Sequence, residues 1–160
     1  MAFFSKYDYP PLLAPGRHVM TLPDIKAHFV DPFPDHPRRK HLFTLFEEFL
    51  QAVLVSGIPC EIWIDGSWLT TKPEPRDLDV TLIVEADTAQ RLNADQQAFM
   101  HTVSEGAFAQ DVDCFAYARL DREHPDFGDA YLDPAYDWGC QYGLESGEQW
   151  LKGFVVLKVR

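Results

Sequence analysis

The sequence has few basic residues for its length. It carries 14 lysine and arginine residues against 25 aspartate and glutamate residues, which gives a formal net charge of −11. Proteins that bind nucleic acids usually present a basic patch to the phosphate backbone, and this composition offers little material for one. The local run Arg38-Arg39-Lys40-His41 could make a small phosphate contact, but such a run is more often the solvated face of a helix. Nucleic acid is therefore not expected as the main partner.

Cysteines and long apolar runs are also scarce. The three cysteines, Cys60, Cys114 and Cys140, lie far apart, and the six histidines show no zinc-like spacing with them. Without a disulfide framework, the sequence favours a reducing compartment, which is the cytoplasm. Residues 1–6 lack the apolar core of a signal peptide, and nothing approaches the length of a membrane span. We therefore expect no membrane association and no structural zinc.

The apolar content is sufficient for one globular domain. Of the 160 residues, 46% are hydrophobic and 14% are aromatic, which suits a folded core rather than a disordered chain. We expect a single domain over residues 1–160, with an extended N-terminal arm over 1–20 and an irregular loop over 119–138.

Periodicity and end signals predict the main elements. Helices are expected over 22–29 with Thr21 as N-cap, over 38–56 with Gly57 as its stop, and over 87–105 with Thr88 as cap. Strands are expected over 61–64, 77–84, 111–118 and 153–159, and the last of these is expected to close the sheet.

The centre of the sequence is a strand that runs into a Gly-Ser turn. Residues 61–68, Glu-Ile-Trp-Ile-Asp-Gly-Ser-Trp, predict a short buried strand and then the turn. Gly66 permits a tight turn and leaves room for a ligand close to the main chain. Ser67 adds a hydroxyl and suits the start of a helix, where free N–H groups and the helix dipole attract phosphate.

A pair of aspartates follows a proline-broken loop. Asp77 and Asp79 are expected to point the same way, because residues i and i+2 of a strand share a face. Two adjacent carboxylates repel each other, and a bound divalent cation is the usual relief. A phosphate-binding turn that faces such a pair is the equipment of metal-dependent nucleotidyl transfer.

This order, Gly-Ser, nine residues and then Asp-Leu-Asp in an apolar strand, resembles the nucleotidyltransferase superfamily with the DNA polymerase β-like fold. The wider run over 65–80, with a Gly-Ser-aromatic turn and a Lys and a Pro before the Asp pair, is similar to a small bacterial branch of it. Trp68 stands where Phe is commoner in that branch. The resemblance implies an α/β (α+β) fold in which helices pack on a mixed central sheet.

In the resembled family a third carboxylate lies on a later strand, flanked by apolar residues. Asp113 has that setting, and Asp111 shares its face parity and stays as a substitute. The resemblance implies that Asp77 and Asp79 hold Mg²⁺, with Mn²⁺ as an alternative, and that Asp79 and Asp113 share a second, catalytic ion.

The resemblance also implies a nucleoside triphosphate as substrate, with ATP as the expected donor. Gly66 and Ser67 would bind its β and γ phosphates. Lys72 or Arg76 would neutralise the triphosphate, and a solvated surface role for each of these two cations is equally open.

Relatives that extend a primer or modify tRNA carry further domains, for which 160 residues leave no room. The resemblance therefore implies a minimal enzyme that moves a nucleoside monophosphate to a hydroxyl of a protein or small molecule, often in bacterial toxin–antitoxin or phage-defence operons. One alternative is an enzyme that modifies tRNA or another RNA. The other is an inactive protein of this fold that binds a partner protein through an aromatic C-terminal region. The aromatic residues of that region are Tyr131, Tyr136, Trp138, Tyr142 and Trp150.

Overall fold

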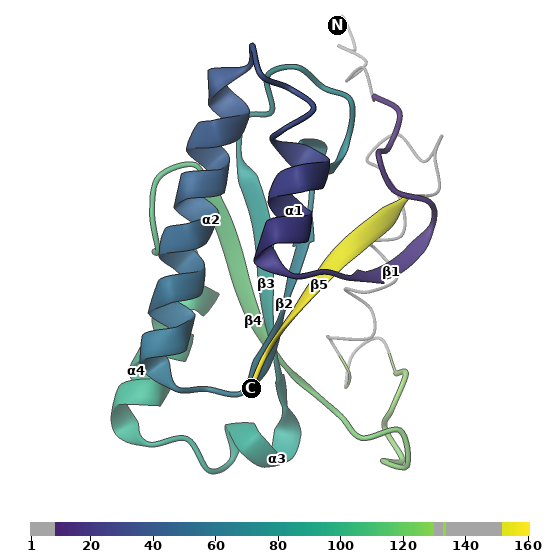
Figure 1. Ribbon diagram of the computed structural model, residues 1–160. Coiled ribbons are helices and arrows are strands. Elements are labelled where there is room, and N and C mark those ends of the chain that lie inside the picture. Colours follow the sequence, from purple (N-terminus) through teal and green to yellow (C-terminus); the bar gives the residue numbers. More distant parts are fainter. Residues whose placement is uncertain (1–8, 130–132, 134–151) are drawn as a thin grey trace, which may run out of the picture.

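A computed structural model describes residues 9–129, 133 and 152–160 of the chain, which form an α+β domain (Figure 1). In chain order its elements are β1 (Gly16–Val19), α1 (Leu22–Phe29), α2 (Pro37–Ser56), β2 (Cys60–Asp65), the 3-10 helix η1 (Ser67–Leu69), β3 (Leu78–Glu85), α3 (Ala86–Ala89), α4 (Ala94–Ser104), β4 (Val112–Arg119) and β5 (Gly153–Val159).

The strands form one mixed sheet in the order β1-β5-β2-β3-β4. β2 runs antiparallel to both of its neighbours, β3 and β5, whereas β1 pairs in parallel with β5 and β3 in parallel with β4. The mixed sheet with helices packed on it agrees with the α+β class expected from the sequence.

Two expectations for the ends of the sheet need correction. The expected last strand is present as β5, but it lies between β1 and β2 instead of closing the sheet at an edge. The edge strand on that side of the sheet is β1, which falls within the expected N-terminal arm. Its four residues, Gly-Arg-His-Val, show little alternation of polarity, and they are ordered by parallel pairing with the apolar strand β5.

One face of the sheet is covered by helices. Phe29 of α1 and Phe46 and Phe49 of α2 are fully buried in a core that also contains Ile62 and Leu82 from the sheet. The opposite face carries a smaller apolar cluster of four buried residues, Trp63, Ile83, Phe154 and Val156. Side chains alternate between faces along a strand, so odd-numbered residues of β2, β3 and β4 lie on this second face.

The helix ends follow local capping signals. Thr21 caps α1 in a capping box with Asp24, and Gly57 ends α2 in the left-handed conformation at φ 65°, as the sequence predicts. The helix expected over 87–105 is in fact two helices, so that expectation was wrong. Asn93 accepts a hydrogen bond from the Gln96 amide at 2.9 Å and begins α4 with a capping box, while Thr88 lies inside α3. Within the described part of the chain, no helix is long and apolar enough to cross a membrane.

Candidate functional site

A row of three carboxylates crosses three neighbouring strands. Asp65 at the end of β2 lies opposite Asp79 of β3, and Asp79 lies beside Asp113 of β4. All three are odd-numbered and therefore share the sheet face away from α1 and α2. Asp65 is buried, Asp79 is half-buried and Asp113 is exposed, so the row runs from the interior of the described sheet to its β4 edge.

The two remaining acidic candidates lie just outside the strands. Asp77 precedes β3, and its charge acts on Asp79 even though it is not part of the ladder. Asp111 precedes β4, has a positive φ of 66°, and places its carboxylate 3.1 Å from the Arg38 guanidinium. Of the two candidates for a third carboxylate, Asp113 thus faces Asp79, while Asp111 is paired elsewhere.

The row shifts the acid–base behaviour of its central member. The pKa of Asp79 is raised from its ordinary value of 3.8 to about 7. Burial is the largest cause, followed by the negative charges of Asp77, Asp65 and Asp113, and the positive charge of Lys152 opposes them. Asp79 therefore titrates near neutral pH, where a nearby cation would favour its ionised form.

The backbone of the Gly-Ser turn lies directly against this carboxylate. Gly66 has φ 83° and ψ −171°, a region that is almost restricted to glycine. A Cβ atom there would be 1.7 Å from Oδ2 of Asp79. Glycine is therefore required at position 66 both for its conformation and for the space that Asp79 occupies.

Ser67 begins a helical turn, as expected. This turn is much shorter than the helix that is needed for phosphate binding by a helix dipole. η1 is a single 3-10 turn of three residues, and the Ser67 carbonyl accepts a hydrogen bond from the Thr70 hydroxyl at 2.7 Å. The contribution of a helix dipole at Ser67 is correspondingly small.

The loop between η1 and β3 is held by a buried arginine. Arg39 of α2 is 0% exposed, and its guanidinium donates hydrogen bonds to the carbonyls of Trp68 at 2.9 Å, Thr70 at 2.5 Å and Lys72 at 2.7 Å. It also donates to the Phe29 carbonyl at 3.0 Å.

The neighbouring Arg38 donates to the carbonyls of Pro75, at 3.2 Å, and of Arg76. The interpretation of the 38–41 run as a phosphate contact or a solvated face is therefore wrong for Arg38 and Arg39, which fasten the loop to α2. Among the described residues, the side chains of Lys72 and Arg76 have no ion-pair partner, so both remain available on this loop.

Two residues of this region were not predicted from the sequence. Lys152, directly before β5, is 6% exposed, and its Nζ lies 2.8 Å from Oδ1 of the equally buried Asp65. Burial raises the pKa of Asp65, while the charge and hydrogen bond of Lys152 and the Gly66 amide act in the opposite direction. Asp65 directly precedes the Gly-Ser turn in the central motif, so its position close to that turn was foreseeable. Lys152 lies 87 positions further along the chain, and no local pattern relates the two.

The acidic row could contribute to a metal site, but it does not form a complete one. Among residues 9–129, 133 and 152–160, no three histidine, cysteine, aspartate or glutamate side chains come together to bind one ion. Mg²⁺ commonly uses one or two carboxylates and takes its other ligands from water and substrate phosphates. The pair Asp79 and Asp113, with Asp77 beside it, is compatible with such a shared site.

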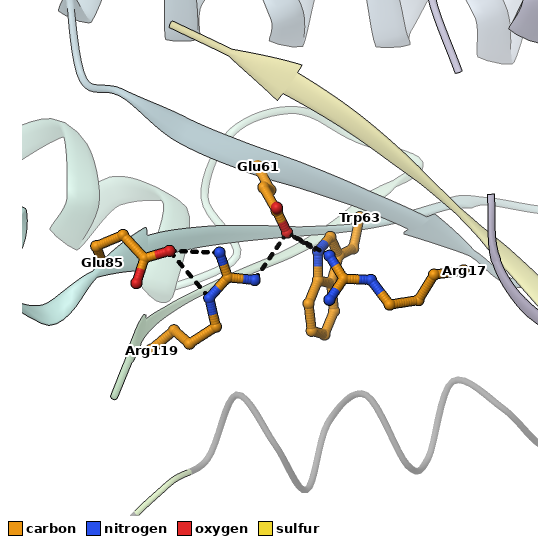
Figure 2. A network of polar contacts seen from close by, with 5 residues as sticks. All are labelled: Arg17, Glu61, Trp63, Glu85 and Arg119. Carbon is orange, nitrogen blue, oxygen red and sulfur yellow. Dashed lines mark hydrogen bonds and ion pairs between the residues drawn. The ribbon is translucent and has the colours of Figure 1, made fainter. Parts of the chain in front are cut away.

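The same sheet face carries a hollow of about 730 Å³ at its other end. Figure 2 shows the polar network that lines it, centred on Glu61. Glu61 accepts hydrogen bonds from Arg17 at 2.8 Å, Trp63 at 2.9 Å and Arg119 at 2.9 Å, and Arg119 also pairs with Glu85. Glu61 and Asp65 are four residues apart on β2, which places Glu61 roughly 13 Å from the inner end of the carboxylate row, and Trp63, which also lines the hollow, lies between them.

This network keeps Glu61 ionised. Burial alone would raise the pKa of Glu61, but the hydrogen bonds from Trp63 and Arg119 and the charges of Arg119 and Arg17 outweigh it, so the pKa is lowered. Glu61 and its arginine partners are thus paired charges within the hollow, and the volume of the hollow falls within the usual range of small-molecule sites.

The thiols of the described region are inert. Cys60 and Cys114 are buried and free, as predicted, and burial together with the charge of Glu61 raises the pKa of Cys60 to about 12. Cys140 and the five C-terminal aromatic residues proposed as a partner surface lie outside the described residues, as do residues 130–132 and 134–138 of the loop expected over 119–138.

Fold and site together define an α+β protein in which the sheet face opposite α1 and α2 carries a row of carboxylates beside a glycine turn. The chain belongs to a family of unknown function (DUF6932), whose model matches residues 5–158. Searches of curated proteins and of solved structures found no significant match.

Proposed function

We propose that this protein is a metal-dependent nucleotidyltransferase with a DNA polymerase β-like fold, which transfers a nucleoside monophosphate from a triphosphate, ATP in the first instance, to a hydroxyl group. The observation that carries the proposal is the placement of Asp79 beside Asp113, with the backbone of Gly66 against the Asp79 carboxylate. This brings the acidic residues of two strands and the Gly-Ser turn to one end of one sheet face.

The roles follow from position. Asp77 and Asp79 would hold one Mg²⁺ or Mn²⁺ together with phosphate oxygens, and Asp79 and Asp113 would share a second ion. When bound, the ions would neutralise the triphosphate and stabilise the leaving pyrophosphate. Ser67, with Lys72 and Arg76 on the loop that Arg39 fastens, would bind the phosphates.

Asp113 is the exposed member of the row and is the best placed to meet an acceptor. A bond would form between the acceptor oxygen and the α-phosphorus, and the bond from that phosphorus to pyrophosphate would break. The proton of the acceptor hydroxyl would pass to the Asp113 carboxylate.

The hollow around Glu61 favours an acceptor that is either a small molecule or a protein that inserts one side chain. It shares the sheet face of the carboxylates, and its central residue Glu61 lies about 13 Å from Asp65 along β2. A molecule seated there would reach the row without the extended cationic track that a nucleic acid requires. We include in this proposal that the enzyme acts within a toxin–antitoxin or phage-defence system.

A thermal-shift titration tests the proposal. Each nucleoside triphosphate is added in turn with millimolar Mg²⁺ to the wild type, to Asp79→Asn and to Asp35→Asn. Asp35 is exposed and remote in sequence from the row, so its substitution makes the same change of charge as a control.

At least one triphosphate should raise the melting temperature of the wild type and of Asp35→Asn, because a ligand that binds only the native state stabilises it. Asp79→Asn should lose the shift. If no triphosphate stabilises the wild type, the site does not bind nucleotides and the proposal is wrong. Stabilisation without transfer of label from any α-labelled triphosphate would favour the inactive nucleotide-binding module instead.

A further inference from the structure

Lys152 is buried at the inner end of the carboxylate row. Lysine is rarely buried unless it is paired, and here both partners of the Lys152–Asp65 pair retain side-chain exposures of only 8% and 10%. The two strands that bring them together, β5 and β2, are neighbours in the sheet. The pair is therefore fixed by the fold and is not a chance contact of flexible side chains.

Lys152 is also the cation that balances the row. Its charge acts on Asp79 against the combined charges of Asp77, Asp65 and Asp113. In the described part of the chain, no other lysine or arginine forms an ion pair with any of these four aspartates. Removing Lys152 would leave these carboxylates without an ion-pair partner among the described residues.

We propose that Lys152 is a tethered counter-ion, which makes the carboxylate row a weak site for a divalent cation alone and lets the cation bind only together with phosphate groups. An ammonium a few ångströms from the row repels an incoming divalent ion and competes with it for Asp65. Phosphate oxygens bring negative charge that offsets Lys152. They also supply metal ligands in place of Asp65, which is paired with Lys152. The inference rests on the proposed function for the identity of the phosphate ligand, but its main consequence concerns metal binding without nucleotide.

A counter-ion and an ordinary buried ion pair affect different properties of the protein. A pair that only supports the fold changes stability when one partner is removed. A counter-ion also changes the metal affinity of the row, and it does so through its charge and not its shape. Lys152→Arg, which keeps the charge, therefore separates the two roles from Lys152→Met, which removes it.

The experiment measures Mn²⁺ binding by electron paramagnetic resonance of the free ion, without nucleotide and at constant pH and ionic strength. The wild type and Lys152→Arg should bind Mn²⁺ weakly, and Lys152→Met should bind it about tenfold more tightly or better, because one positive charge has left the row. Adding a non-hydrolysable triphosphate should tighten binding to the wild type. Equal or weaker Mn²⁺ binding by Lys152→Met would overturn the inference.

A second comparison keeps the test decisive if Lys152→Met does not fold. Asp65→Asn and the double variant Asp65→Asn/Lys152→Met both lack the buried partner charge and differ only at Lys152. The double variant should bind Mn²⁺ about tenfold more tightly than Asp65→Asn, and equal affinities would contradict the inference.

The outcomes are separable from those of the proposed function. Nucleotide transfer by the wild type with no effect of Lys152→Met on Mn²⁺ affinity would reject the counter-ion role alone. A gain of Mn²⁺ affinity in Lys152→Met, in a protein that neither binds nor transfers nucleotides, would support the counter-ion role and reject the transferase.

Discussion

At the scale of single residues, Asp79 is held in a position that opposes its own ionisation. Its pKa of about 7, against 3.8 ordinarily, means that the folded protein binds this proton more tightly than the unfolded chain does. The contribution of Asp79 to stability is therefore most favourable below pH 4. It is lost as the pH rises from about 4 to about 7. Such a penalty is typical of functional sites, where charge is gathered for a ligand.

The first prediction is that Asp79→Asn stabilises the metal-free protein at pH 8 while it abolishes nucleotide transfer. Asparagine has the same shape and no charge to bury. The pKa shift sets a ceiling of about 4 kcal/mol, and relaxation around the side chain should reduce the gain to about 1–2 kcal/mol. Urea unfolding from pH 4 to pH 8 measures it, with Asp35→Asn as the charge-matched control. A loss of stability at pH 8 would show that Asp79 is a packing group and not a strained ligand.

The second prediction concerns Gly66 and uses Gly57 as its control. Both glycines have positive φ, but a Cβ at Gly57 meets nothing within 4 Å, whereas a Cβ at Gly66 would collide with the Asp79 carboxylate. Gly57→Ala should cost about 1 kcal/mol of stability from backbone strain. Gly66→Ala should cost at least about 2 kcal/mol and remove nucleotide binding, because Asp79 must move as well. Equal costs in urea unfolding would mean that the close approach at Gly66 is unimportant.

At the scale of elements, the loop between η1 and β3 depends on α2. Four carbonyls from α1, η1 and the loop converge on the Arg39 guanidinium, which also lies over the Phe33 ring at 3.7 Å. A buried carbonyl that loses its hydrogen-bond donor is costly. A single side chain of α2 thus positions the segment that would carry the phosphate ligands.

The third prediction is that Arg39→Met destabilises the fold and loosens this loop. Methionine fills similar space but donates no hydrogen bond, so about 3–5 kcal/mol of stability should be lost. Hydrogen exchange should accelerate in residues 66–77 before it does elsewhere. Lys40→Met is the matched control, because Lys40 is exposed on the same helix and should change stability by less than about 0.5 kcal/mol. Unchanged hydrogen exchange in residues 66–77 would show that the loop keeps its conformation without Arg39.

The elements that sequence analysis predicted well are those with a local pattern. The apolar stripe of α2 and its Gly57 stop, and the apolar runs of β2, β3 and β5, are each encoded within a few neighbouring residues. The register that sets Asp79 beside Asp113 follows from the same runs, since both aspartates lie at corresponding places near strand starts.

What escaped prediction depends on partners far away in the chain. β1 is a strand because β5 pairs with it, and Arg39 is buried because carbonyls about 30 residues further on accept its hydrogen bonds. Lys152 acquires its role from Asp65 in the same way. A basic run on a helix and a lysine before a strand have no local feature that distinguishes these roles from solvation.

At the scale of the whole molecule, the charge distribution bears on the acceptor. The net charge is −11, and several of the cations that the structure describes are already committed. Arg17 and Arg119 pair with Glu61, Arg38 with Asp111, and Lys152 with Asp65. A polyanionic acceptor would therefore meet a repulsive field around the carboxylate row, which only Lys72 and Arg76 would offset from the described loop before β3.

The last prediction is that label from an α-labelled triphosphate enters a protein or a small molecule and not RNA. Purified protein, Mg²⁺ and each triphosphate are incubated separately with total tRNA, with a soluble protein fraction and with a small-molecule fraction, at low and at moderate salt. Asp79→Asn serves as the inactive control. Transfer to the protein or the small-molecule fraction should persist as salt rises, because the Glu61 network at the centre of the hollow is paired within the protein. If label instead enters tRNA, and the amount transferred falls steeply as salt rises, the result would indicate counter-ion release from a phosphate backbone. It would mean that the uncommitted cations Lys72 and Arg76 outweigh the net charge locally and that the protein modifies RNA.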